Sequence, residues 1–126
     1  MTRRDELVTE VLDLLARYQQ AIETGTRDEI QTMVHLPVGY ITEDDVQMRE
    51  RYPFDPVKLR EVTGFHHGKS EYDVIAVDET KAHIQITATR MRADDSPIEY
   101  VSAFYILQKR DGTWKIAAFS GIRTEA

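Results

Sequence analysis

The order of its hydrophobic patterns constrains the fold of this chain more than any single motif does. Helix-type periodicity fills the sequence up to about residue 65, and strand-type segments rich in β-branched and aromatic residues fill the remainder. Four strands are expected, at residues 69–79, 81–92, 98–109 and 113–124. The polar links between them are too short for crossover connections, so neighbouring strands should be antiparallel. Helices and strands that are segregated along a chain predict an α+β fold, with helices on one face of an antiparallel sheet.

The first part of the chain predicts three helices. They span residues 5–24, 26 to about 34, and 55–64. In the first helix, apolar side chains recur at three- and four-residue steps, which is the pattern of a helix with one buried stripe. Thr26 and Glu29 resemble a capping box at the start of the second helix, and Asp55-Pro56 supplies an N-cap and a first-turn proline for the third. Gly25 and Gly64 are the expected helix stops.

The segment between the second and third helices predicts a strand and a long loop. Pro37 blocks helix continuation, and residues 38–42 alternate as a short strand. Residues 46–53 have no clean period and are interpreted as loop. The one long loop of the chain is therefore 42–54, and a long loop at the rim of a sheet is either a lid over a pocket or a mobile surface segment. Both interpretations stay open.

Composition and charge disfavour several classes of partner. Twenty-two acidic against 16 basic residues give a net charge of −6, and the basic residues are scattered among acids, which argues against nucleic acid. No stretch approaches the ~20 consecutive apolar residues of a membrane helix, so no membrane association is expected. The absence of cysteine excludes disulfides, thiol nucleophiles and thiolate metal sites.

The length of the chain and its first residues bear on domain organisation and location. A chain of 126 residues fits one domain with one core, so residues 1–126 are expected to form a single domain. The first residues lead directly into the predicted helix without the apolar run of a signal peptide, which predicts a cytoplasmic location. His66 and His67 are adjacent, but neighbouring side chains on an extended chain point apart. Neither a metal site nor a cofactor is therefore expected.

The strand expected at residues 81–92 changes character along one face. Its apolar register runs into two arginines, in the order Ala82, Ile84, Ile86, Ala88, Arg90 and Arg92. An arginine that continues a core row either reaches solvent or an internal ion pair, or lines the open end of a cavity. In a cavity, its guanidinium can hold a carboxylate or phenolate. The sequence leaves both interpretations open.

The strand expected at residues 98–109 is apolar on both faces. One register contains Ile98, Tyr100, Phe104 and Ile106, and the other contains Val101, Ala103, Tyr105 and Leu107. If one face packs on the helices, no further helix remains to cover the second face. A second copy of the sheet is the economical cover, so we expect a two-fold homodimer through the outer sheet face, with the second register as its contact. Both registers of the strand at 113–124 remain candidates for the inward face.

Two groups of residues carry a resemblance to a known family. They are Arg17-Tyr18 with Gly25-Thr26-Arg27-Asp28-Glu29-Ile30, and Thr89-Arg90-Met91 with Tyr105 and Asp111-Gly112-Thr113-Trp114-Lys115-Ile116. In this order they resemble the nuclear-transport-factor-2-like superfamily, particularly its SnoaL-like branch, over essentially the whole chain. The resemblance implies a cystatin-like cone whose curved sheet wraps the helices, leaves a pocket at its open end and often dimerises through the sheet. Members include ketosteroid isomerases, dehydratases, polyketide cyclases, epoxide hydrolases and binding domains, so the fold does not decide the chemistry.

The resemblance to ketosteroid isomerases can be followed residue by residue. Tyr18 falls where those enzymes carry the tyrosine that donates to the substrate oxyanion. Thr42 aligns with their carboxylate base and Phe104 with their protonated carboxylic acid, and neither side chain can perform those roles. The arrangement of epoxide hydrolases would use Arg90 between two carboxylates, which the inward registers do not offer. Both chemistries are disfavoured.

These patterns together predict an apolar pocket between the first helix and the sheet. Tyr18 is expected to donate a hydrogen bond there and Arg90 to offer charge to an anionic ligand group, while Tyr40 and Phe104 supply apolar walls. The preferred function is a small-molecule-binding domain for a small hydrophobic or anionic ligand. Two alternatives are an isomerase, dehydratase or cyclase-type enzyme acting on a small hydrophobic carbonyl compound, and a dimerisation module whose pocket is filled by side chains.

Overall fold

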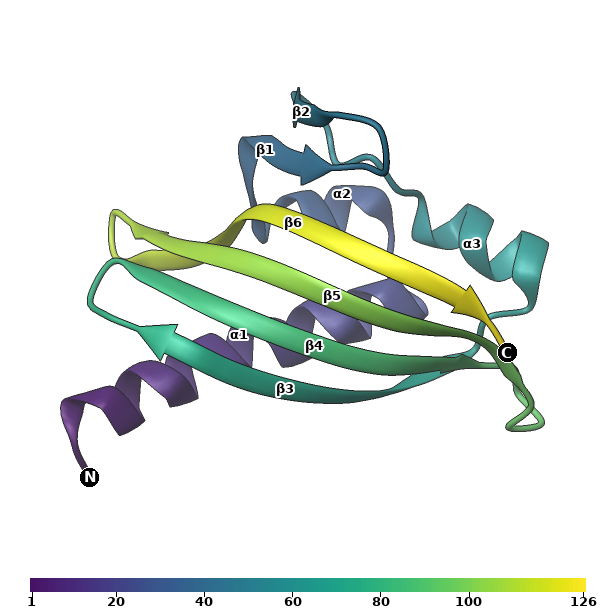
Figure 1. The fold of residues 1–126 in the computed structure, drawn as a ribbon, viewed down its shortest axis with the longest axis horizontal. Coiled ribbons are helices and arrows are strands. Elements are labelled where there is room, and N and C mark those ends of the chain that lie inside the picture. Colours follow the sequence, from purple (N-terminus) through teal and green to yellow (C-terminus); the bar gives the residue numbers. More distant parts are fainter.

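The computed structural model describes residues 1–126 and contains three helices and six strands. The helices are α1 (Arg3–Thr24), α2 (Arg27–Gln31) and α3 (Pro56–Thr63). The strands are β1 (Val34–Ile41), β2 (Val46–Arg49), β3 (His67–Val77), β4 (Lys81–Met91), β5 (Pro97–Arg110) and β6 (Thr113–Glu125). All six strands form one sheet in the order β2-β1-β6-β5-β4-β3. Figure 1 shows the four long strands side by side, with α1 packed behind them.

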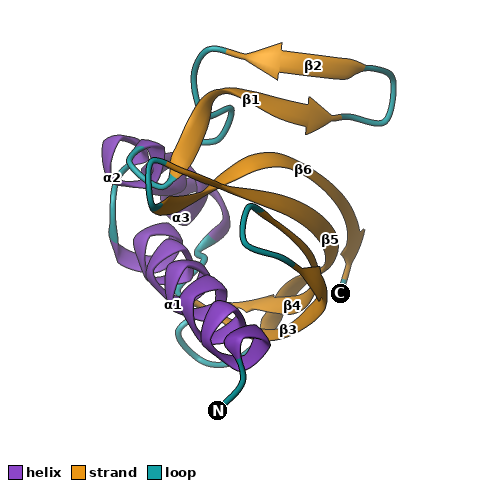
Figure 2. Cartoon of the chain, turned by 90° about the vertical axis from the view of Figure 1, so that its left-hand side faces the viewer, coloured by secondary structure: helices purple, strands orange, loops and turns teal.

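The sheet curves around α1, which confirms the predicted α+β cone. Figure 2 shows β3 and β4 on one side of α1 and β1 and β2 on the other, so the sheet wraps the helix without closing. The side chains that α1 buries recur at helical spacing, as the periodicity predicts: Leu7, Val11, Leu14, Leu15, Tyr18, Ala21 and Ile22. No helix of the chain is sufficiently long and apolar to span a membrane.

Local capping explains where the helices begin and end. The Asp55 side chain accepts hydrogen bonds from the backbone N–H groups of Val57 and Lys58, and Pro56 occupies the first turn of α3. Gly64 ends α3 with a φ of 75°, a left-handed conformation that glycine adopts without strain. The Thr26 side chain caps α2. The predicted start of α2 is confirmed, but the helix ends at Gln31 because the chain then enters β1.

Two strand predictions are wrong, and both concern the segment before α3. The sheet is mixed, since β1 runs parallel to β6 while the other neighbours are antiparallel. β2 lies within the predicted loop at 46–53, where it pairs with β1 as a hairpin. A four-residue strand that pairs on one edge carries little periodicity of its own, which explains why the sequence does not reveal it.

The two faces of β5 are assigned opposite to the sequence expectation. Ala103 and Leu107 are buried on the inner, concave face, and Tyr105 packs against the same core. Phe104 and Tyr100 lie on the outer face, where 39% and 48% of each residue is exposed. The expectation that the register containing Ala103 forms an outer contact is therefore wrong. The outer face is nevertheless partly apolar.

A β-bulge in β6 explains why its inward face was ambiguous. Leu107 of β5 pairs with Ile116, whereas the neighbouring Ile106 pairs with Ala118, so Ala117 is an extra residue in β6. Before the bulge, Ile116 is buried; after it, Phe119 is. Each register of β6 therefore points inward along part of its length. The bulge turns Phe119 and the alternate residues after it toward the concave side of the sheet.

Candidate ligand-binding cavity

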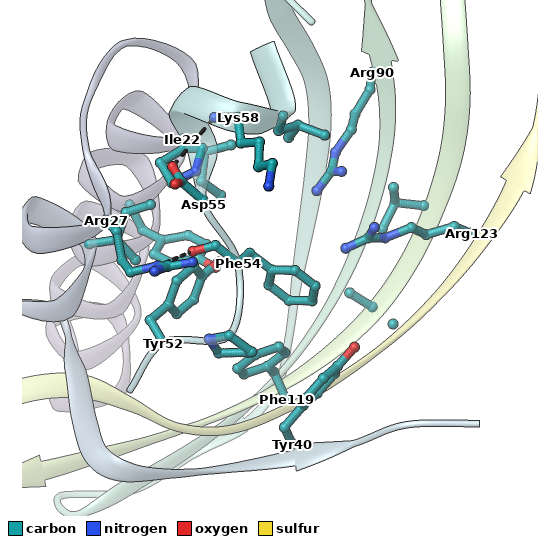
Figure 3. A pocket seen from close by; sticks show the side chains of 18 of the residues that line it. Ile22, Arg27, Tyr40, Tyr52, Phe54, Asp55, Lys58, Arg90, Phe119 and Arg123 are labelled. Atoms are coloured by element: carbon teal, nitrogen blue, oxygen red, sulfur yellow. Dashed lines mark hydrogen bonds between the residues drawn. The ribbon is translucent and has the colours of Figure 1, made fainter. Parts of the chain in front are cut away.

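A cavity of about 410 Å³ opens between α1, α3 and the concave side of the sheet. Figure 3 shows side chains from the helices, from the segment before α3 and from the sheet converging on it. Twelve of its 22 lining residues are hydrophobic. The volume lies within the range of small-molecule sites, about 300–1,000 Å³. The open end of the cone is therefore hollow.

Aromatic rings form the wall of the cavity near β1 and β6. The ring of Tyr40 stacks on that of Phe119 with centroids 4.9 Å apart, and Phe54 meets Tyr40 edge to face at 5.4 Å. Tyr52 contacts both Phe54 and Phe119. Edge-to-face and offset contacts of this kind are favourable beyond simple burial. They hold the segment before α3 against the sheet and give the cavity one continuous aromatic surface.

Three tyrosines gather where α1 meets this wall. The hydroxyls of Tyr18 and Tyr52 share a hydrogen bond, and the ring of Tyr105 meets that of Tyr18 edge to face at 5.8 Å. Burial is the main reason that the pKa of Tyr18 is raised well above its ordinary value of 10.0. Burial also raises the pKa of Tyr52 and of Tyr105. All three hydroxyls are therefore neutral hydrogen-bonding groups at physiological pH.

Positive side chains surround the mouth of the cavity. Figure 3 shows Arg90 from β4, Arg123 from β6 and Lys58 from α3 extending into the same space. The guanidinium of Arg123 lies 4.8 Å from the centre of the Phe54 ring. The charges of Arg90 and Arg123 oppose the effect of burial on the pKa of Tyr52 and Tyr105, as expected for cations close to phenol groups. Neither Arg123 nor Lys58 forms an ion pair within the chain.

Acidic side chains do not balance this charge. Asp55 is the one carboxylate in the lining, and it is engaged as the N-cap of α3. Glu99, from the neighbouring strand β5, accepts a hydrogen bond from Arg90 at 2.8 Å, and both side chains are largely shielded from solvent. Both interpretations of Arg90 thus hold in part, because it forms an internal ion pair and also lines the cavity. Arg90 has one carboxylate beside it, not the two that an epoxide hydrolase arrangement would need.

The structure places three of the four sequence-predicted pocket residues in the lining. Tyr18, Tyr40 and Arg90 all line the cavity. Phe104 does not, because side chains alternate along β5 and its neighbours Ala103 and Tyr105 face inward. Instead Phe104 lies 6.0 Å from the ring of His83 on the outer face. Its expected place as a pocket wall is corrected accordingly.

Among the cavity residues that sequence reasoning missed, three were missed for instructive reasons. Tyr52 and Phe54 belong to the segment interpreted as loop, and their alternating aromatic pair is the signal that could have revealed them. Arg123 continues the inward register only because of the bulge in β6. The loop 42–54 is thus divided: its first part forms the hairpin with β2, and its last residues form part of the cavity wall.

The two positions aligned with the carboxyl groups of ketosteroid isomerases lie outside the cavity. Thr42 sits at the hairpin turn, where its hydroxyl donates to Asp45 Oδ1 at 2.7 Å. Phe104 is on the outer face. No group of three or more His, Asp or Glu side chains in the chain is arranged to hold a metal ion.

Comparisons with known proteins agree with this architecture. The profile of a family described as NTF2-like protein (DUF6841) matches residues 57–124. A domain of unknown function with a cystatin-like fold from Nostoc punctiforme PCC 73102 is 16% identical, with a TM-score of 0.72, over 100% of this chain and 81% of that one. An NTF2-like protein of unknown function from Methylobacillus flagellatus KT is 20% identical, with a TM-score of 0.64, over 98% and 95% of the two chains.

Proteins with the names of enzymes are also among the similar structures. A hexachlorocyclohexane dehydrochlorinase is 13% identical, with a TM-score of 0.59, over 98% of this chain and 90% of that one. Identities at this level show a shared fold and leave the activity open. No curated protein sequence matches the chain.

Proposed function

This chain belongs to the NTF2-like family DUF6841, and from that premise we propose that its cavity binds a small, largely apolar molecule that carries a negative charge. The observation that carries the proposal is the pair of unpaired cations, Arg123 and Lys58, at the mouth of an aromatic cavity. The chain as a whole has a net charge of −6, so this local excess of positive charge is not a consequence of overall composition.

The lining matches the two parts of such a ligand. The rings of Phe54, Tyr40 and Phe119 offer an apolar surface for an aromatic or alicyclic body. The guanidiniums of Arg90 and Arg123 offer donors for a carboxylate, phenolate or sulfonate. The hydrogen bond between Tyr18 and Tyr52 uses one of their two hydroxyl protons, which leaves the other to donate to a ligand oxygen.

A matched pair of dyes tests the proposal. 8-Anilinonaphthalene-1-sulfonate carries one negative charge, and N-phenyl-1-naphthylamine has the same rings without the sulfonate. We expect the sulfonate to bind one molecule per chain and about tenfold more tightly than the amine, since a charge-assisted hydrogen bond contributes about 1.5–3 kcal/mol. Isothermal titration calorimetry on the folded protein measures both affinities and the stoichiometry.

Two variants separate the charge from the cavity itself. Arg123→Gln should remove most of the preference for the sulfonate and leave the binding of the amine unchanged. Gly121→Leu should weaken both dyes, because Gly121 lines the cavity and a Cβ there meets no atom within 4 Å. Equal affinity for the two dyes would contradict recognition of an anion. Tight binding of both dyes to the Gly121→Leu protein would place them outside the cavity.

The two alternative functions fit the lining less well. An isomerase, dehydratase or cyclase needs a base within reach of the substrate, and the single lining carboxylate, Asp55, already accepts two backbone hydrogen bonds. The tyrosines would supply donors for a carbonyl oxygen but no base. A dimerisation module with a side-chain-filled pocket is disfavoured by the cavity volume of about 410 Å³.

We also propose that two copies of the chain pair through the outer face of the sheet. Support comes from the apolar side chains exposed there, with Tyr100 at 48%, Phe104 at 39% and Ile122 at 69% exposure. Light scattering should then report at least twice the chain mass of 14.6 kDa, and Phe104→Lys should lower the reported mass by weakening this association. A dimer that is unaffected by Phe104→Lys would contradict this contact.

A further inference from the structure

The hairpin formed by β1 and β2 ends in an edge strand with nothing beyond it. Figure 2 shows β2 as the outermost strand of the molecule, standing away from the helices and from the long strands. Val46 and Met48 lie on this strand and are 74% and 64% exposed, among the highest values for apolar side chains in the chain. An exposed apolar edge strand is a template for pairing with another strand.

The backbone of β2 determines which of its groups are free. Thr42 N–H donates to the carbonyl of Asp45 at 2.9 Å, so these two residues form a hydrogen-bonded pair of the hairpin. Such pairs alternate along antiparallel strands. Asp45, Gln47 and Arg49 therefore direct their backbone groups toward β1. Val46 and Met48 direct theirs toward the free edge, where a partner strand would have to bond to them.

We infer that β2 pairs antiparallel with the β2 of a second copy of this chain, with Val46 opposite the partner's Met48 and Gln47 on the two-fold axis. A symmetric pair of antiparallel strands forms its hydrogen bonds between residues with outward backbone groups, and Val46 and Met48 meet that condition. The pairing covers four exposed apolar side chains on one face. It joins the two sheets into one continuous sheet.

Charge fixes this register. With Gln47 on the axis, Asp45 lies opposite the partner's Arg49. Symmetry repeats this contact, so two pairs of opposite charge form across the axis. Within the chain, neither Asp45 nor Arg49 forms an ion pair. Asp45, Gln47 and Arg49 are joined by side-chain hydrogen bonds, which shows that they share one face of β2.

A single introduced cysteine tests the register, because the natural chain has none. Directly opposed residues of a non-hydrogen-bonded pair have Cα atoms about 4.5 Å apart, within disulfide range. Gln47→Cys should therefore give a disulfide-linked dimer under mild oxidation. Met48→Cys is the matched control: it is on the same strand, but its own counterpart lies about 7–8 Å away, beyond disulfide range. Non-reducing electrophoresis and mass spectrometry measure the linked fraction.

Three outcomes of this cysteine experiment are informative. Linkage at residue 47 well above that at residue 48 supports the pairing. Equal linkage at both positions reflects random collision and overturns it, as does linkage at 48 alone. The variant Ser102→Cys places a cysteine on the outer face of the sheet and leaves β2 unchanged. Its disulfide-linked fraction tests the proposed contact through the outer sheet face independently.

Charge reversal tests the contacts across the axis. Asp45→Lys or Arg49→Asp alone should weaken association through β2 about tenfold, because each change replaces two attractive pairs by two repulsive ones. The double variant with both changes exchanges the charges and should restore the original affinity. Sedimentation equilibrium measures the dissociation constants. Failure of the double variant to recover, with all three proteins folded by circular dichroism, would overturn the inferred register.

Discussion

The two ends of the cone are built from the same strands and differ in what fills them. At the packed end, defined by Val11, Ile84, Leu107, Trp114 and Ile116, each residue is at most 6% exposed and none lines the cavity. At the hollow end, defined by Tyr18, Tyr52, Phe54, Arg90 and Arg123, aromatic rings and cations surround about 410 Å³ of space. The comparison teaches that the packed core and the proposed binding cavity are separated along the sheet.

A single residue marks the change from one end to the other. The bulge at Ala117 allows Ile116 to face the packed end while Phe119 and Arg123 face the hollow end. Insertion of one alanine after Ala117 should therefore have the largest effect of any single change, because a second extra residue either reverses the face of the residues that follow or shifts their pairing with β5 by two residues. We expect the unfolding free energy to fall by several kcal/mol and the binding of the dye to be lost. Ala117→Val, which keeps the register, is the matched control.

Denaturant unfolding and dye titration of the two proteins measure these effects. If the insertion variant retained both its stability and its dye binding, the pairing of β6 with β5 beyond the bulge would not be what directs Phe119 and Arg123 into the cavity.

A cavity-creating change at the packed end should separate stability from binding. Leu107 is fully buried there, and Leu107→Ala should lower the unfolding free energy by about 2–5 kcal/mol. Binding of the sulfonate dye should remain within about twofold of wild type, since Leu107 is not in the cavity lining. Urea unfolding measures the unfolding free energy, and calorimetry measures the affinity for the sulfonate dye. A loss of affinity as large as that caused by Arg123→Gln would contradict the separation of the two ends.

Alkaline pH should weaken the hollow end through its buried tyrosines. From about pH 10.0, the ordinary pKa, the unfolded chain releases phenol protons that the folded chain retains, because burial raises the pKa of Tyr18. The unfolded state then binds fewer protons, so stability falls as pH rises. Tyr18→Phe removes one such group and should reduce the fall by up to about 1.4 kcal/mol per pH unit.

Urea midpoints at pH 8 and at pH 11 test this, with each protein referred to its own value at pH 8. Identical losses in the wild type and the Tyr18→Phe variant would show that this phenol does not titrate between the two states.

How far the sequence predicts each end depends on the range of the interactions involved. α3 is predicted well because its signals, Asp55-Pro56 and Gly64, act within a single turn of backbone. The apolar row of β4 through Ile84 is likewise predicted by a local signal, the alternation of side chains along one strand. The hairpin with β2 and the parallel pairing of β1 with β6 depend on contacts between distant segments, which no local pattern encodes.

The candidate site follows the same rule. Arg90 is identified because it interrupts a regular buried register with a charged group, and Tyr18 because it falls where the resemblance to ketosteroid isomerases places the tyrosine that donates to the oxyanion. Phe104 was misplaced because β5 is apolar on both faces, so alternation alone does not say which face is inner. Arg123 was missed because one extra residue in β6 reverses its direction. The convergence of these residues on one cavity is a property of the folded sheet.

The central claim is that the hollow end recognises an anion on an aromatic surface. A crystal structure of the protein with bound 8-anilinonaphthalene-1-sulfonate tests it most directly. The claim predicts one dye molecule in the cavity, its sulfonate within hydrogen-bonding distance of Arg90 or Arg123 and its rings against Phe54 and Phe119. Dye bound at the outer sheet face or the β2 edge, with the cavity empty, would contradict it.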